Sequence, residues 1–202
     1  MNPSMHAYEH LTLYNTGIVL GLALVVIHSL LLFRADQIKR FLIKFPRNQK
    51  IGQVILGLGM LLFWLLIAPE GKGWISTLAM DMTEFNAAKP ILRLLMPVLF
   101  VIVSLSISEF LSVRALGLLG LLIAQPLLSA SFLKDPTSRL LIPLWTYGLI
   151  GFSLFWVGMP YTFRDAVSWV TAKQSRWSAC SAAGIAYGLA ILACALLFWK
   201  GF

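Results

Sequence analysis

The chain has 202 residues, of which 59% are hydrophobic and only 12% are charged. A soluble domain carries charge on about a quarter of its residues, so this composition excludes a soluble globular protein and predicts an all-α, polytopic membrane helical bundle. The formal net charge is +8. The basic residues gather beside apolar stretches and do not cover a broad face, so we expect no nucleic-acid partner.

Six apolar stretches are long enough, or nearly so, to cross a bilayer, and the chain length suits a single integral membrane domain over residues 1–202. Polar segments between them carry apolar residues at helical spacing, which predicts two or three amphipathic helices at the membrane surface, within residues 34–50, 74–85 and 160–177. The expected spans are residues 11–33, 51–68, 91–108, 115–133, 140–159 and 178–199.

The distribution of basic residues predicts the orientation. Six spans place both termini on one side, and if that side is outside, the cytoplasmic segments hold ten of the 16 Lys and Arg residues. The positive-inside rule then favours N-out and C-out in a plasma or bacterial inner membrane. Six bases of the first loop are candidates for contact with anionic lipid head groups: Arg34, Lys39, Arg40, Lys44, Arg47 and Lys50.

Two GxxxG spacings predict close helix packing: Gly17 with Gly21 in the first span, and Gly184 with Gly188 in the sixth. Packing within the chain is the favoured interpretation, and dimerisation is the alternative. The expected orientation places Gly17 near the outer surface and Gly184 in the inner half. The two pairs are therefore not expected to face each other.

A polar cluster is expected where the spans meet the cytoplasmic surface. Its members are one histidine, one acid, one base and nearby serines: His28, Glu109, Arg114, Ser104, Ser106 and Ser108. Ionisable groups within a membrane usually face the bundle interior or water, so the cluster could relay protons or bind a polar head group. In the plainer interpretation, Glu109 and Arg114 form a solvated turn, and His28 bonds a neighbouring carbonyl.

Metal and haem chemistry have weaker signals. The tail sequence from His6 to His10 resembles the H-x-x-E-H order of inverted zinc peptidases, with Glu9 as general base and Glu84 as a third ligand. The resemblance covers five residues of a short tail. A bis-histidine haem would need a partner for His28 at its own depth, which only another subunit could supply. We therefore predict no cofactor, with zinc and haem as alternatives.

The functional prediction rests on what the sequence lacks. No acid lies deep in a span, and there is no phosphate-binding glycine loop and no Ser-His-acid set. We predict a protein without its own catalytic centre, either an accessory or structural subunit of a membrane assembly or a lipid-binding protein, with membrane lipid and other membrane subunits as partners. The alternatives are a small transporter or channel with its site at His28, Glu109 and Arg114, and a lipid-modifying enzyme at the cytoplasmic face.

Overall fold

The computed structural model describes residues 11–69, 82–106 and 109–201. All regular structure in these residues is helical, which confirms the predicted all-α membrane fold. Six helices are long and apolar enough to cross a membrane: α1 (Leu13–Phe33), α3 (Gln49–Leu66), α4 (Lys89–Ser106), α5 (Leu111–Ser131), α6 (Leu141–Gly158) and α8 (Gln174–Phe198). The helix α5 begins at Leu111, so Arg114 lies in its first turn.

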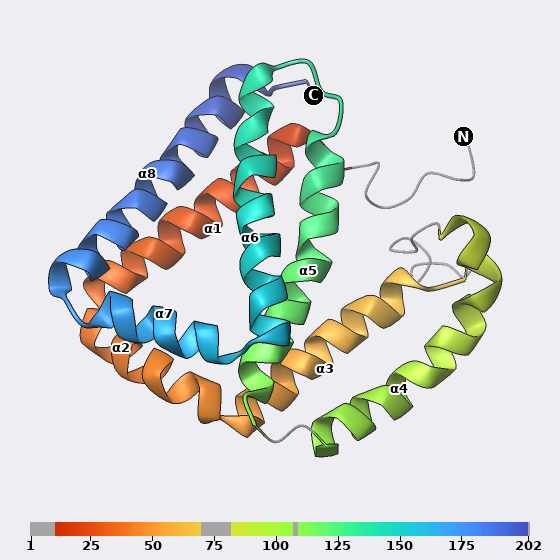
Figure 1. The fold of residues 1–202 in the computed structure, drawn as a ribbon. Helices are drawn as coiled ribbons and strands as arrows, with labels where there is room; N and C mark the ends of the chain where they lie inside the picture. Colours follow the sequence, from red (N-terminus) through yellow and green to blue (C-terminus); the bar gives the residue numbers. More distant parts are fainter. Residues whose placement is uncertain (1–10, 70–81, 107–108, 202) are drawn as a thin grey trace.

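Two short amphipathic helices, α2 (Ala35–Lys44) and α7 (Tyr161–Thr171), lie side by side at one end of the spans (Figure 1). They correspond to the first and third of the expected surface helices. Most of the second, residues 74–81, lies outside the described residues, and a 3-10 helix, η4 (Thr83–Ala88), follows it. Two further 3-10 helices, η2 (Phe45–Arg47) and η5 (Thr137–Leu140), begin the turns into α3 and α6.

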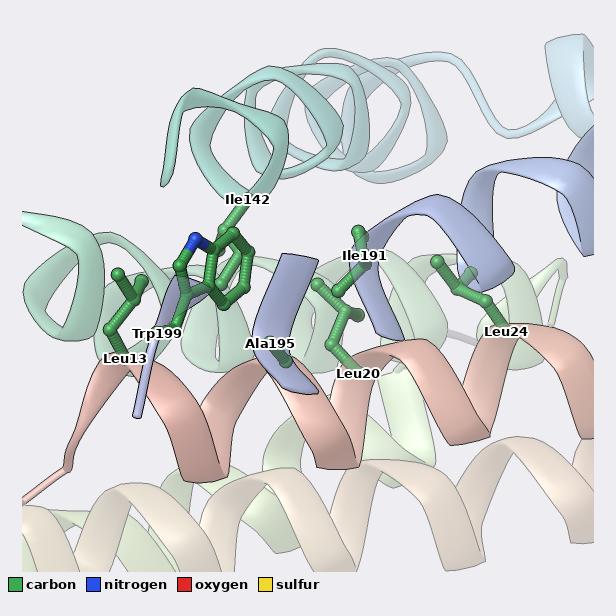
Figure 2. Packing of buried hydrophobic residues seen from close by; sticks show 7 residues of the cluster. All are labelled: Leu13, Leu20, Leu24, Ile142, Ile191, Ala195 and Trp199. Atoms are coloured by element: carbon green, nitrogen blue, oxygen red, sulfur yellow. The ribbon is translucent and has the colours of Figure 1, made fainter. Parts of the chain in front are cut away.

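The spans pack in pairs. Helix α1 lies along α8, and α5 lies between α6 and α3, whereas α4 stands at the edge beside α3 (Figure 1). The largest buried cluster joins α1 to α8, and Ile142 of α6 closes one end of it (Figure 2). Its members are Leu13, Leu20, Leu24, Ile142, Ile191, Ala195 and Trp199.

Glycines allow α1 and α8 to approach closely. A Cβ on Gly21 would lie 2.7 Å from Leu192 Cγ and 3.0 Å from the carbonyl oxygen of Gly188, so the two backbones meet there. The expectation that the glycine pairs do not face each other is therefore wrong for their second members. The different depths of Gly17 and Gly184 do not determine how Gly21 and Gly188 lie. Gly17 and Gly184 contact other partners: Gly17 lies against the ring of Trp199, and Gly184 lies against the ring of His28.

A second close approach, which the sequence analysis did not single out, joins α5 to α6. A Cβ on Gly120 would overlap Ser153 Oγ, and one on Gly117 would lie 2.7 Å from the carbonyl oxygen of Ser153. The Ser153 hydroxyl is fully buried and has no hydrogen-bond partner among the described residues. Small residues allow α5 and α6 to approach closely. The contact leaves the hydroxyl of Ser153 without a hydrogen bond in the described region.

Helices α6 and α8 are joined at one end and separated at the other. At the joined end, Tyr187 Oη donates to the carbonyl oxygen of Leu141 at 2.7 Å, and Trp199 Nε1 donates to Ser138 Oγ at 2.9 Å. At the other end α7 runs between them, so that α6, α7 and α8 form the three sides of a triangle (Figure 1). We call the region between α1, α6, α7 and α8, which two cavities occupy, the wedge.

Candidate functional site

Two cavities occupy the wedge. The first, of about 220 Å³, lies against α7 and is lined by apolar side chains that include Leu42, Phe163 and Val167. The second cavity, of about 430 Å³, is lined by α6 on one side and by α1 and α8 on the other. His28 and Trp156 line both cavities, so they stand where the two meet. Together the cavities fall within the range of about 300–1,000 Å³ that is typical of ligand sites.

His28 is held in place by two contacts. Its Nδ1 lies 2.8 Å from the carbonyl oxygen of Leu24, one turn earlier on α1, and its ring lies against Gly184 of α8. His28 precedes the last residue of α1, Phe33, by five positions, which places it about 7.5 Å from the end of the helix. The absence of a side chain at residue 184 thus leaves room for an imidazole inside the apolar part of the protein.

Ser181 adds a second polar atom to the first cavity. It is only 2% exposed, and its hydroxyl has no hydrogen-bond partner among the described residues. Other hydroxyls in the helices bond a carbonyl oxygen one turn earlier: Thr146 reaches Ile142 at 2.8 Å, and Thr171 reaches Val167 at 2.8 Å. Such back-bonding is the usual way to satisfy a hydroxyl in a helix. Ser181 Oγ lacks it, as do the buried hydroxyls of Thr16 and Ser153, but of these three only Ser181 lines a wedge cavity.

The other members of the expected polar cluster lie elsewhere. Glu109 is exposed and makes no ion pair among the described residues. Arg114 is half-buried on α5, with a buried Nε that has no hydrogen-bond partner in the described part of the chain. Ser104 is buried on α4, the helix beside α3, and Ser108 lies outside the described residues. Neither Glu109, Arg114 nor Ser104 lines a wedge cavity, which leaves His28 apart from them.

The zinc ligands proposed in the tail, His6 and His10 with Glu9, lie outside the described residues. Glu84 is exposed at the start of η4. Within residues 11–69, 82–106 and 109–201, no three or more His, Cys, Asp or Glu side chains gather as a metal site. His28 is the one histidine in these ranges, so a haem there would take its second axial ligand from elsewhere.

The basic first loop divides into two groups. Lys39 is turned toward α8: its Nζ donates to Gln174 Oε1 at 2.6 Å and lies 5.3 Å from the centre of the Trp177 ring. The other five bases are exposed and make no ion pair among the described residues: Arg34, Arg40, Lys44, Arg47 and Lys50. These five form what we call the basic face, whereas Lys39 fastens α2 to the start of α8.

Sequence analysis missed the α8 side of the wedge. Trp177, Ser181, Gly184 and Gly188 follow one another at intervals of four, three and four residues, which places them on one helical face. That face packs on α1: Trp177 Nε1 donates to the carbonyl oxygen of Leu31 at 2.9 Å. This spacing can be recognised in the sequence. Extending the Gly184 and Gly188 pair by the same helical periodicity places Ser181 on the face of α8 that packs on α1.

The geometry is therefore that of an apolar site with a few polar atoms, bounded on one side by the basic helix α2 and its neighbour α7. Comparison with known proteins found no matching family model, no matching curated protein and no matching solved structure.

Proposed function

We propose that the chain is an integral membrane protein that has no catalytic centre of its own and binds a lipid-like ligand in the wedge. The observation that carries this proposal is the pair of apolar cavities at His28 and Trp156. Exposed residues of α6, among them Leu144, Gly148 and Phe152, line the second cavity. An apolar molecule could therefore enter sideways from the bilayer, without crossing the basic face.

The proposed orientation places α2 and α7 at the cytoplasmic surface of a plasma or bacterial inner membrane, with both termini outside and the six spans as one bundle. Ten of the 16 basic residues then lie on the cytoplasmic side. The five residues of the basic face would contact anionic head groups, each worth about 1 kcal/mol near such a surface. This attraction orients the protein and brings the α7 side of the wedge to the lipid head-group level.

The alternatives receive less support. A transporter built on His28, Glu109 and Arg114 would need these side chains at one cavity, but only His28 lines the wedge cavities. A lipid-modifying enzyme would need an activated nucleophile beside the ligand. Ser181 and Cys180 line the first cavity with His28, but neither is hydrogen-bonded to the imidazole, and no Asp, Glu, Lys or Arg lines either cavity. A subunit role is compatible with lipid binding, and it predicts that a partner copurifies in mild detergent.

Photolabelling tests the proposal. The protein is reconstituted with a phosphatidylcholine that carries a diazirine in its acyl chain, and labelled residues are mapped by mass spectrometry. Helix α4, whose Leu94 and Leu105 are each 76% exposed, reports the general contact with bulk lipid. We expect labelling of half-buried wedge residues such as Leu31 and Val167 at a level at least equal to that of α4.

A matched pair of variants locates the labelling. Ala166 and Ala179 are both exposed, but only Ala166 lines a wedge cavity. Ala166→Phe should reduce labelling in the wedge and leave α4 unchanged, whereas Ala179→Phe should change neither. Wedge labelling that stays far below that of α4 in the unmodified protein would contradict the proposal.

A further inference from the structure

The polar atoms of the wedge indicate which lipid-like molecules it accepts, an inference that rests on the proposed function. We propose that the ligand is an apolar molecule with a hydroxyl group, and that His28 Nε2 and Ser181 Oγ bind this hydroxyl. The chemical class includes long-chain alcohols, prenols and sterol-like molecules. The hydrogen bond of His28, the burial of Ser181 and the lack of charged side chains in the cavity walls support this assignment.

The tautomer of His28 sets the polarity of the site. A carbonyl oxygen can only accept, so the 2.8 Å contact with Leu24 requires that Nδ1 carry the proton. In the neutral ring Nε2 then has a free lone pair and accepts a hydrogen bond. No described residue donates to Nε2. The ligand group that best fits this atom is therefore a hydrogen-bond donor.

Ser181 provides a second, independent indication. Its hydroxyl is 2% exposed and unpartnered among the described residues, and it lines the cavity that His28 also lines. On α8 it lies three residues before Gly184, against which the His28 ring packs. Polar groups in an apolar interior are normally hydrogen-bonded, because an unmade bond there is costly. One ligand hydroxyl could donate to His28 Nε2 and accept from Ser181 Oγ.

The cavity walls argue against a charged ligand group. No Asp, Glu, Lys or Arg lines either wedge cavity. A phosphate or carboxylate beside His28 would have no positively charged partner in the cavity walls, about 7.5 Å from the end of α1. Of the other polar groups in the walls, Trp177 Nε1 donates to Leu31 and Tyr187 Oη donates to Leu141. The remaining ones, the indole N–H groups of Trp145 and Trp156 and the thiol of Cys180, are also without charge, so a neutral hydroxyl fits the site.

The test compares two probes that differ in one hydrogen-bond donor. One is 1-hexadecanol with a diazirine in its chain, and the other is the methyl ether of the same molecule. Labelling of the wedge is divided by labelling of α4 in the same sample, which corrects for partitioning into the bilayer. We expect the alcohol to label the wedge about tenfold more than the ether, as one good hydrogen bond allows.

Two variants test the assigned atoms. His28→Leu removes the acceptor that only the alcohol can use, so it should reduce the alcohol-to-ether ratio toward one and leave ether labelling unchanged. Ser181→Ala removes a donor to the oxygen of either probe, so it should lower wedge labelling by both probes and leave their ratio near that of the unmodified protein. Ser181→Ala is a small change in a helix, so it keeps the test decisive if His28→Leu fails to fold. Equal wedge labelling by both probes in the unmodified protein would overturn hydroxyl recognition and leave the proposed function standing. Wedge labelling far below that of α4 with both probes would overturn both.

Discussion

Replacement of Gly184 by alanine should destabilise the protein by forcing the His28 ring out of its position. A Cβ at residue 184 would overlap Cδ2, Nε2 and Cγ of that ring. Overpacking of this kind costs about 1–3 kcal/mol, and loss of the bond from Nδ1 to Leu24 adds about 0.5–1.5 kcal/mol. Alanine gains up to about 1 kcal/mol over glycine in a helix, so we expect a net loss of about 1–3 kcal/mol.

Thermal unfolding in detergent, followed by intrinsic tryptophan fluorescence, measures this effect. For a chain of this size, each kcal/mol corresponds to about 2–4 °C in Tm. Gly151→Ala is the matched control, because a Cβ there would meet nothing within 4 Å. We expect Gly184→Ala to lower the Tm by several degrees and Gly151→Ala to leave it unchanged or slightly raised.

A double-mutant cycle then assigns the cause. In a His28→Ala background the ring is absent, so Gly184→Ala should no longer destabilise the protein. The resulting coupling energy should be about 1–3 kcal/mol. Equal Tm values for Gly184→Ala and Gly151→Ala, or additive effects of His28→Ala and Gly184→Ala, would refute the described contact between α1 and α8.

Further predictions concern the helix contacts, the basic face and the turn before α5. Gly120→Ala should lower the Tm because its Cβ would overlap Ser153 Oγ, whereas Ser153→Ala should leave the Tm unchanged or raise it by removing a buried, unpartnered hydroxyl of the described region. Lys39→Gln should lower the Tm by breaking the link between α2 and α8. Arg40→Gln should instead reduce the extra stability that phosphatidylglycerol gives over phosphatidylcholine, by about 1 kcal/mol. Glu109→Gln should change neither the Tm nor labelling of the wedge, because its carboxylate is exposed and has no ion-pair partner among the described residues.

Hydropathy and length were sufficient to predict the membrane helices. The six long apolar helices overlap the expected spans, since a stretch such as Leu13–Phe33 has no other stable environment. The surface helices α2 and α7 were also recognisable, because their polar residues restrict the apolar ones to one face. Both predictions use only the residues of one segment, so they do not require knowledge of which helices pack together.

The wedge could not be predicted in the same way, because it depends on which helix faces meet. Helices α1 and α8 are apolar on nearly all sides, so periodicity does not indicate that His28 points toward Gly184. The expected depth in the membrane was the only reason to group His28 with Glu109. In the structure His28 lines both cavities and Glu109 lines neither. Likewise, a basic segment at a membrane surface does not show that Lys39 bonds Gln174 while its neighbours stay exposed.

The most direct test of a ligand in the wedge is an experimental density map of the protein in a lipid nanodisc, with a bound antibody fragment to aid alignment. We expect elongated density between α6 and α8 that ends within hydrogen-bonding distance of His28 Nε2 and Ser181 Oγ. A map in which α6 and α8 pack together along their full length, with protein side chains filling the wedge, would contradict a ligand site there.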